Sequence, residues 1–222
     1  MLIARKAARF YAWTWAAVSL LAAALPLDVS AAPTAKASPP SLDAALFDDP
    51  AAPVVGNPDG DVTVVAFTDY NCPYCRASDG NLAALIASDA KVRVVYKDWP
   101  ILAKSSVTAA KIAIAAHWQG KYAAVHQALM RMRARPATDQ DISQAVVASG
   151  VDVAQLNRDL DKRDDEIVAL LKRTMAEADA LKLRGTPVYI VGPFVEASAL
   201  DATGFKRLVS DARKERAAEK TR

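Results

Sequence analysis

Apolar and polar positions follow two patterns along this chain, one with the period of strands and one with the period of helices. Short apolar runs rich in β-branched residues predict strands at 62–69, 92–96, 187–191 and 194–196. Between the second and third of these runs, apolar residues recur every three or four positions. The segment 105–183 is therefore predicted to be helical.

Start and stop signals divide this segment into several helices. Gly120 and Gly150 each follow an apolar repeat, as glycine often does at a helix end. The sequence Thr138-Asp-Gln-Asp141 is a capping box with an acid in its fourth place, which predicts a helix start. Further helices are predicted after the first strand, ending near Ser88, and around 205–212. The first two strands and the helix between them should form a parallel, right-handed βαβ unit.

The N-terminal segment has the pattern of an export signal. Arg5, Lys6 and Arg9 form a basic start, residues 10–27 are largely apolar, and the small residues 29–31 suit cleavage. We therefore expect residues 1–31 to be a cleaved signal peptide that directs the chain to the periplasm. An uncleaved membrane anchor is the alternative, because the apolar stretch is close to the length that spans a bilayer.

The remaining chain divides by composition and by element order. Residues 32–58 are rich in proline and alanine and predict a linker and an irregular lead-in. Two parts of one α/β domain follow at 59–102 and 184–222, with an inserted helical subdomain at 103–183 between them.

The balance of basic and acidic residues narrows the classes of binding partner. Without residues 1–31 the chain holds 25 basic and 24 acidic residues, so it is close to neutral. Nothing in this balance points to nucleic acid or to an anionic membrane surface.

The only two cysteines, Cys72 and Cys75, lie in the sequence Cys-Pro-Tyr-Cys between a predicted strand and a predicted helix. Residues three apart on a first helical turn are neighbours, so the two sulfurs can close a short disulfide. The unpaired N–H groups and the dipole of that turn favour a thiolate on Cys72. Pro73 suits the first turn because the hydrogen-bond donor it lacks has no partner there.

Two other interpretations of the cysteine pair stay open: an inert structural disulfide, or half of a zinc site. Zinc would need His117 and His126, whose spacing lies outside the usual one and whose segments look like ordinary amphipathic helix. An exported chain that keeps its only cysteines in this motif favours redox chemistry.

Three segments resemble the DsbA-type periplasmic thiol–disulfide oxidoreductases. They are Val64-Val-Ala-Phe-Thr-Asp-Tyr-Asn-Cys-Pro-Tyr-Cys75, Val95-Tyr-Lys-Asp-Trp-Pro100 and Arg184-Gly-Thr-Pro-Val-Tyr189. The resemblance extends from about Pro50 to the end of the chain. With the element order, it implies an α/β, thioredoxin-like fold with an inserted helical subdomain.

The resemblance also implies roles for individual residues. Cys72 would be the nucleophile and Cys75 the resolving cysteine of a redox-active disulfide. Pro187 would be a cis-proline that lies against the motif and, with Thr186 before it, offers backbone to a substrate peptide. Tyr74, next to the reactive sulfur, would tune the thiolate and contact substrate, and Pro73 belongs to the same group. No cofactor and no metal are expected.

The direction of the reaction stays open at this point. Cys-Pro-Tyr-Cys is similar to the motif of the DsbG-like isomerases, but only about forty residues of the processed chain precede Cys72, too few for their N-terminal dimerisation domain. We expect a monomeric thiol–disulfide oxidoreductase that exchanges disulfides with cysteine-containing exported proteins and is reset by a membrane or periplasmic redox partner. The alternatives are an isomerase or reductase and, in another class, a non-catalytic metal-binding or chaperone-like module.

One functional residue of the resembled family is missing. Its members often bury an acid in the strand beneath the motif, to assist proton transfer at the resolving cysteine. That position is Ala66 here, which predicts slow resolution by Cys75 and faster turnover in Ala66→Glu. Lys97 matches the usual basic partner of such an acid and could favour the Cys72 thiolate. It could equally be an exposed lysine at a strand end.

Overall fold

The computed structural model describes residues 44–221. The predicted signal peptide and residues 32–43 of the predicted linker lie outside the described residues. Within the described part of the chain, no helix is both long and apolar enough to cross a bilayer.

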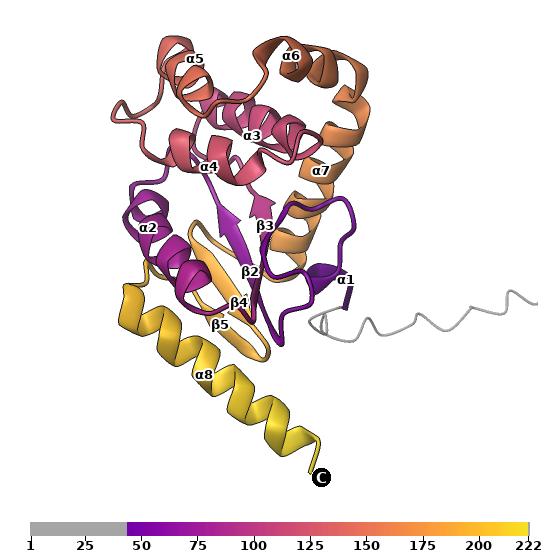
Figure 1. The fold of residues 1–222 in the computed structure, drawn as a ribbon, viewed down its shortest axis with the longest axis vertical. Helices are drawn as coiled ribbons and strands as arrows, with labels where there is room; N and C mark the ends of the chain where they lie inside the picture. Colours follow the sequence, from indigo (N-terminus) through magenta and orange to yellow (C-terminus); the bar gives the residue numbers. More distant parts are fainter. Residues whose placement is uncertain (1–43, 222) are drawn as a thin grey trace, which may run out of the picture. The chain divides into compact units, whose positions relative to one another are not determined.

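A mixed five-stranded sheet with the order β1-β3-β2-β4-β5 forms the centre of the described structure (Figure 1). Its strands are β1 (Val54–Gly56), β2 (Val62–Thr68), β3 (Val92–Asp98), β4 (Val188–Val191) and β5 (Phe194–Glu196). β2 and β3 are parallel over their whole length, whereas the other neighbouring pairs are antiparallel. The predicted βαβ unit is therefore confirmed.

The helices fall into two groups. Helices α2 (Pro73–Ser88) and α8 (Ala202–Glu219) pack against each other beside the sheet. The predicted helical insertion occupies the chain between β3 and β4, and α3 to α6 gather beyond the carboxyl ends of β2 and β3 (Figure 1). Its members are α3 (Lys104–His117), α4 (Tyr122–Met130), α5 (Asp139–Ala148), α6 (Val153–Lys162) and α7 (Asp164–Ala180). The fold class predicted from the sequence is confirmed.

The predicted capping box opens α5. The Thr138 hydroxyl accepts the N–H of Asp141, and the Asp141 carboxylate accepts the N–H of Thr138. Two otherwise unpaired backbone donors are satisfied in this way, which fixes the start of the helix.

The lead-in contains a strand, β1, that the sequence pattern missed. A short helix, α1 (Ala44–Phe47), precedes β1, which pairs with β3 at the sheet edge. Leu46 and Ala52 are buried in the common core. A three-residue strand is too short to show a period, so composition alone suggested a linker up to residue 58. From Leu46 onward, the lead-in belongs to the packed structure.

The central strand β2 explains why the first apolar run is continuous rather than alternating. Val64, Val65, Ala66 and Phe67 are all fully buried, because helices cover both faces of the sheet. The carboxyl end of this strand delivers the chain to the cysteine motif.

Candidate active site

The cysteine motif begins α2. Cys72 is the N-cap residue, with extended backbone (φ −74°, ψ 118°), and Pro73 follows at the first helical turn. The helix start and the position of Pro73 are as predicted from the sequence. Both cysteines are free thiols in this structure.

The sulfur of Cys72 lies among hydrogen-bonding groups. It accepts the backbone N–H of Cys75 at 3.3 Å, and its thiol points to the carbonyl oxygen of Thr186 at 3.1 Å. Hydrogen bonding from the Cys75 thiol, with further help from the backbone N–H groups of Cys75 and Tyr74, outweighs burial and lowers the pKa of Cys72 to about 6. A large fraction of Cys72 is therefore thiolate at neutral pH.

Cys75 has the opposite environment. It is 1% exposed, and burial, followed by its hydrogen bond to Cys72, raises the pKa of its thiol well above the usual range. The pair thus holds one thiolate and one thiol at neutral pH. This asymmetry gives the two sulfurs different chemical roles.

The loop before β4 meets the motif, although it lies more than a hundred residues further along the chain. The Thr186–Pro187 peptide bond is cis, as predicted. Pro187 is buried, and Thr186 directs its carbonyl oxygen at the Cys72 sulfur. β4 can place the loop there because it pairs with the central strand β2.

The structure thus brings Cys72, Cys75, Thr186 and Pro187 together. Tyr74 belongs to the same turn but points outward, with 65% of its surface exposed. Of the motif's two middle residues, it is the one that can offer an aromatic face to a partner.

The structure corrects the expectation for Lys97. Its side chain is fully buried, and its ammonium group donates to Glu177 of α7 at 2.8 Å and to Asp49 at 3.4 Å. Its neighbour in β3, Tyr96, faces α4 instead. Because successive side chains of a strand point to opposite faces, Lys97 lies on the face of the sheet away from α4. It is neither an exposed lysine nor a partner of the Cys72 thiolate.

The strand position beneath the motif holds Ala66 rather than an acid, and tyrosines flank it on the two neighbouring strands. Ala66 is fully buried and pairs with Tyr96 of β3 and Tyr189 of β4. The Tyr189 hydroxyl lies 2.5 Å from the hydroxyl of Ser78, which also donates toward the carbonyl oxygen of Cys75. A longer acidic side chain at position 66 would overpack this site. The faster turnover predicted for Ala66→Glu is therefore no longer expected.

The segment before Cys72 is held by a buried carboxylate that sequence reasoning did not assign. Asp69 accepts hydrogen bonds from the backbone of Asn71, Ile101 and Leu102 and from the hydroxyl of Ser106, all between 2.7 and 3.0 Å. These bonds fasten the motif loop to the chain after β3 and to the start of α3.

Sequence reasoning also missed a histidine. His126 of α4 is 1% exposed, and its two ring nitrogens contact Tyr70 and Asp79, each at 2.9 Å. Since both nitrogens are engaged, His126 is not free to bind zinc beside the cysteines. The spacing of Tyr122 and His126, four residues apart, placed both on one helix face and was the available signal.

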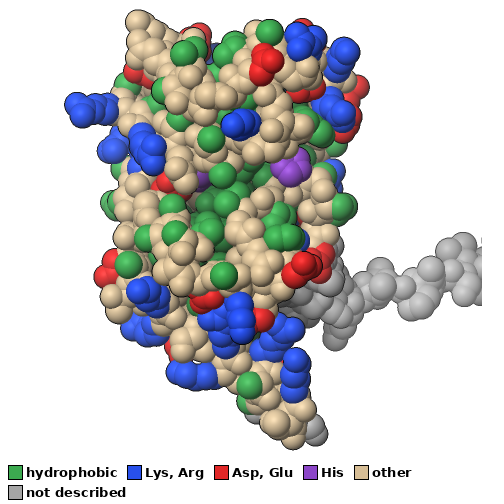
Figure 2. All heavy atoms as spheres, viewed as in Figure 1, with side chains coloured by type: hydrophobic (Ala, Val, Ile, Leu, Met, Phe, Trp, Pro, Cys, Tyr) green, Lys and Arg blue, Asp and Glu red, His purple; other side chains and the backbone are tan. Residues whose placement is uncertain are grey.

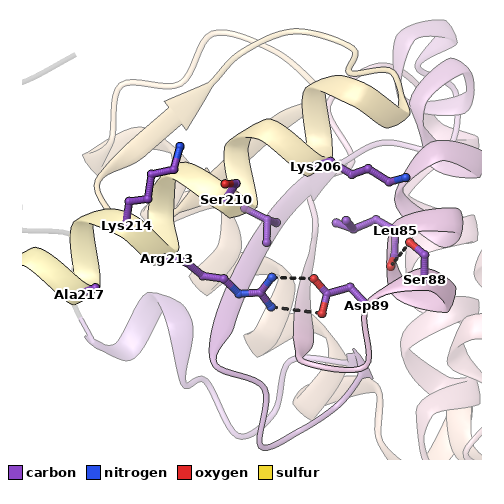
Figure 3. Close-up of a pocket in the computed structure, with 9 residues that line it drawn as sticks. Leu85, Ser88, Asp89, Lys206, Ser210, Arg213, Lys214 and Ala217 are labelled. Atoms are coloured by element: carbon purple, nitrogen blue, oxygen red, sulfur yellow. Dashed lines mark hydrogen bonds and ion pairs between the residues drawn. The ribbon is translucent and has the colours of Figure 1, made fainter.

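One groove on the described surface lies away from the cysteine motif. It separates the end of α2 from α8, and Figure 3 shows Arg213 directed at Asp89 across it. Arg213 also binds Asp61. The residues of α2 that line this groove begin at Leu85, ten residues after Cys75, so the groove lies about 15–20 Å along the helix from the motif. Lysine and arginine side chains of α8 gather at this end of the molecule (Figure 2).

Comparisons with known proteins agree with the fold and the motif. The family model described as Thioredoxin matches residues 48–211. A thioredoxin-like oxidoreductase from Silicibacter pomeroyi DSS-3 is 42% identical, with a TM-score of 0.71 over 77% of this chain and 96% of that one. A periplasmic thioredoxin-like protein from Salmonella enterica serovar Typhimurium is 32% identical, with a TM-score of 0.69 over 76% and 94%. The thiol–disulfide exchange protein alpha-DsbA2 from Wolbachia pipientis is 27% identical, with a TM-score of 0.71 over 75% and 90%.

A curated relative is much longer than this chain. The Na(+)/H(+) antiporter NhaA 1 of Mycolicibacterium gilvum is 26% identical over 158 residues. The match includes 67% of this chain and 25% of the antiporter. The chain therefore spans about a quarter of the length of the curated relatives it matches.

Proposed function

The chain belongs to the thioredoxin family, and from this premise we propose that it is an exported thiol–disulfide oxidoreductase that uses Cys72 and Cys75 to exchange disulfides with cysteine-containing proteins. One observation carries the proposal. The sulfur of Cys72 caps α2, where backbone N–H groups stabilise a thiolate, while Cys75 stays a buried thiol one turn away.

In the oxidised form, a substrate thiolate attacks the sulfur of Cys72. The Cys72–Cys75 bond breaks, a mixed disulfide forms at Cys72, and the Cys75 sulfur leaves as a thiolate that takes up a proton because its pKa is high. A second substrate thiolate then attacks the substrate sulfur of the mixed disulfide. The substrate gains its disulfide, Cys72 leaves as a stabilised thiolate, and two electrons have passed from the substrate to the cysteine pair.

The cis-proline loop would hold the substrate during this exchange. The hydroxyl of Thr186 is buried without a hydrogen-bond partner among the described residues. An extended peptide beside Thr186 could use this group and the neighbouring backbone. Exposed Tyr74 would contact the same peptide, with Pro73 beside it at the start of the helix.

The electrostatics of the pair favour the oxidase over the reductase or isomerase. A thiolate that is stabilised only in the dithiol form makes that form more stable relative to the disulfide. The lowered pKa of Cys72 therefore favours a protein that gives its disulfide away. A membrane or periplasmic redox partner would then remove the two electrons and restore the disulfide.

Location and assembly are part of the proposal. The basic and apolar pattern of residues 1–31 supports export to the periplasm. The similar protein from Salmonella enterica is a periplasmic thioredoxin-like protein, which agrees with this location. We propose that the protein works as a monomer, which light scattering of the processed chain would test.

Trapping the mixed disulfide tests the proposed function. Cys75→Ser should accumulate adducts with cellular proteins that a reductant releases, because Cys72 can no longer be resolved. Cys72→Ser is the matched control and should form none. Absence of adducts in Cys75→Ser would favour the non-catalytic binding module.

Insulin reduction measured beside the refolding of scrambled ribonuclease tests the direction of disulfide exchange. Strong isomerase activity would contradict the oxidase assignment.

A further inference from the structure

We propose that His126, supplied by the inserted helical block, is a positioning residue that holds both flanks of the Cys72–Cys75 motif and so sets the reactivity of Cys72. The inference rests on the proposed function for its meaning in catalysis. Its test measures the thiolate directly and needs no substrate.

The contacts of His126 reach the chain on either side of the cysteines. Tyr70 lies two residues before Cys72, and its hydroxyl is 2.9 Å from Nδ1 of His126. Asp79 lies four residues after Cys75 on α2, and its Oδ1 is 2.9 Å from Nε2. One buried ring on α4 therefore bridges the loop that enters the motif and the helix that leaves it.

The partners determine which nitrogen of the neutral His126 ring carries the hydrogen. An ionised Asp79 can only accept, so Nε2 carries the hydrogen and Nδ1 accepts from the Tyr70 hydroxyl. The Tyr122 hydroxyl donates to Asp98 at 3.1 Å and lies further from Nδ1, at 3.5 Å. Each donor then has an acceptor, as a buried polar cluster requires.

Aromatic packing holds the ring in this orientation. It stacks on Tyr122 with an angle of 23° between the planes, and its centroid is 4.4 Å from that of Tyr96 and 5.3 Å from that of Tyr70. The charged and titratable groups that face it are Asp79 from α2, Asp98 and Tyr96 from β3, Tyr70 from the motif loop and Tyr122 from α4. Groups from the motif loop, α2, β3 and α4 thus hold the ring in place.

Tyr70 connects the histidine ring to the backbone of the motif. Its carbonyl oxygen accepts from Nε of Arg76 at 2.8 Å, and the next turn of backbone is closed by the bond from Cys72 N–H to the Asp69 carbonyl at 3.0 Å. If Tyr70 and α2 lose their shared anchor, the Cys72 sulfur and the Cys75 N–H lose their alignment. A thiolate with weaker hydrogen bonds is less stable, so its pKa rises.

The test follows the ultraviolet absorbance of the Cys72 thiolate as a function of pH in the reduced protein. His126→Leu should move the midpoint upward from about 6 by about one pH unit. Tyr70→Phe, which removes only the hydroxyl, should move it in the same direction. His126→Gln can still donate to Asp79 and should recover part of the shift. His117→Gln is the matched control, because His117 is the other histidine and packs beside Trp118.

Thermal unfolding of each variant separates positioning from simple support of the fold. Variants that unfold at lower temperature while their thiolate midpoint stays with the parent would overturn the inference. In disulfide exchange, the expected result is a kcat lowered roughly threefold to tenfold with KM unchanged. If the parent exchanges no disulfides at all, the proposed function fails while the thiolate midpoints still decide the role of His126.

Discussion

At the scale of single residues, the two cysteines differ because of their surroundings rather than their sequence. Both are almost fully buried, yet one sulfur caps a helix and the other lies beneath it. The helix N-terminus gives Cys72 donors for a thiolate, whereas Cys75 has lost its hydration without equal compensation.

This asymmetry predicts the pH dependence of alkylation. The pKa of Cys72 is depressed in the folded dithiol protein, so the stabilisation it contributes is present above the unfolded value of 9.0 and is lost as pH falls through about 6. The rate of iodoacetamide alkylation at Cys72 should therefore rise through about pH 6 and then level off. Mass spectrometry should find Cys75 unmodified over the same range. Equal labelling of both cysteines would contradict the assigned roles.

A second prediction concerns Asp98, which is buried beside His126. Burial raises the pKa of this carboxyl from 3.8 to about 6, although the nearby His126 opposes the rise. A carboxyl whose pKa is raised in the folded state stabilises the fold below its unfolded pKa. This stabilisation is lost as pH rises through about 6. Asp98→Asn does not titrate, so its stability relative to the parent should improve between about pH 4 and pH 6, by about 3 kcal/mol.

Urea unfolding of parent and Asp98→Asn across this pH range measures the difference. Comparing the two ends of the range cancels any constant effect of the amide group. Asp59→Asn, at an exposed turn, is the control and should follow the parent. Parallel stability curves for parent and Asp98→Asn would show that Asp98 titrates as an ordinary carboxyl.

At the scale of elements, periodicity and end signals found the βαβ unit, the capping box and the helical insertion, because each depends on residues close in sequence. The same signals could not find β1, which is three residues long and owes its existence to β3. They also could not assign Lys97 to a face. That choice depends on Glu177 and Asp49, which lie 80 and 48 residues away in the sequence.

The candidate site divides in the same way. Cys72, Cys75 and Pro187 were predicted because short motifs carry their chemistry. His126, Asp69 and Tyr189 were not, since each acts through partners brought close only by the packing of separate elements. A buried histidine and an exposed one look alike in a single amphipathic helix.

The Asp69 bonds make an element-scale prediction. Asp69→Ala removes the acceptor for three backbone N–H groups and the Ser106 hydroxyl, so the loop before the motif loses its tie to α3. We expect a loss of about 3 kcal/mol in the free energy of unfolding. Asp59→Ala is the matched control and should change it by less than about 0.5 kcal/mol. An Asp69→Ala protein as stable as the control would mean that water replaces the carboxylate.

At the scale of the whole described structure, Lys97 joins three parts of the chain that are distant in sequence. Its buried ammonium group links β3 in the sheet to Asp49 in the lead-in and to Glu177 on α7. Asp49 also binds Arg173 of the same helix. The lead-in and the end of the helical block are thus fastened to the sheet on the face away from α4, independently of the cysteines.

Lys97→Met tests this division of the molecule. Removing one member of a buried ion pair leaves the carboxylates of Glu177 and Asp49 short of a cation, so the variant should lose about 3 kcal/mol of stability in urea unfolding. The matched control is Lys214→Met, at an exposed pair with Asp211 on α8, where a change of less than about 1 kcal/mol is expected. In both variants the thiolate midpoint of Cys72 should stay near 6, because neither lysine touches the motif. A midpoint raised in Lys97→Met alone would mean that its charge reaches Cys72 through the sheet, and would restore the tuning role that the sequence suggested.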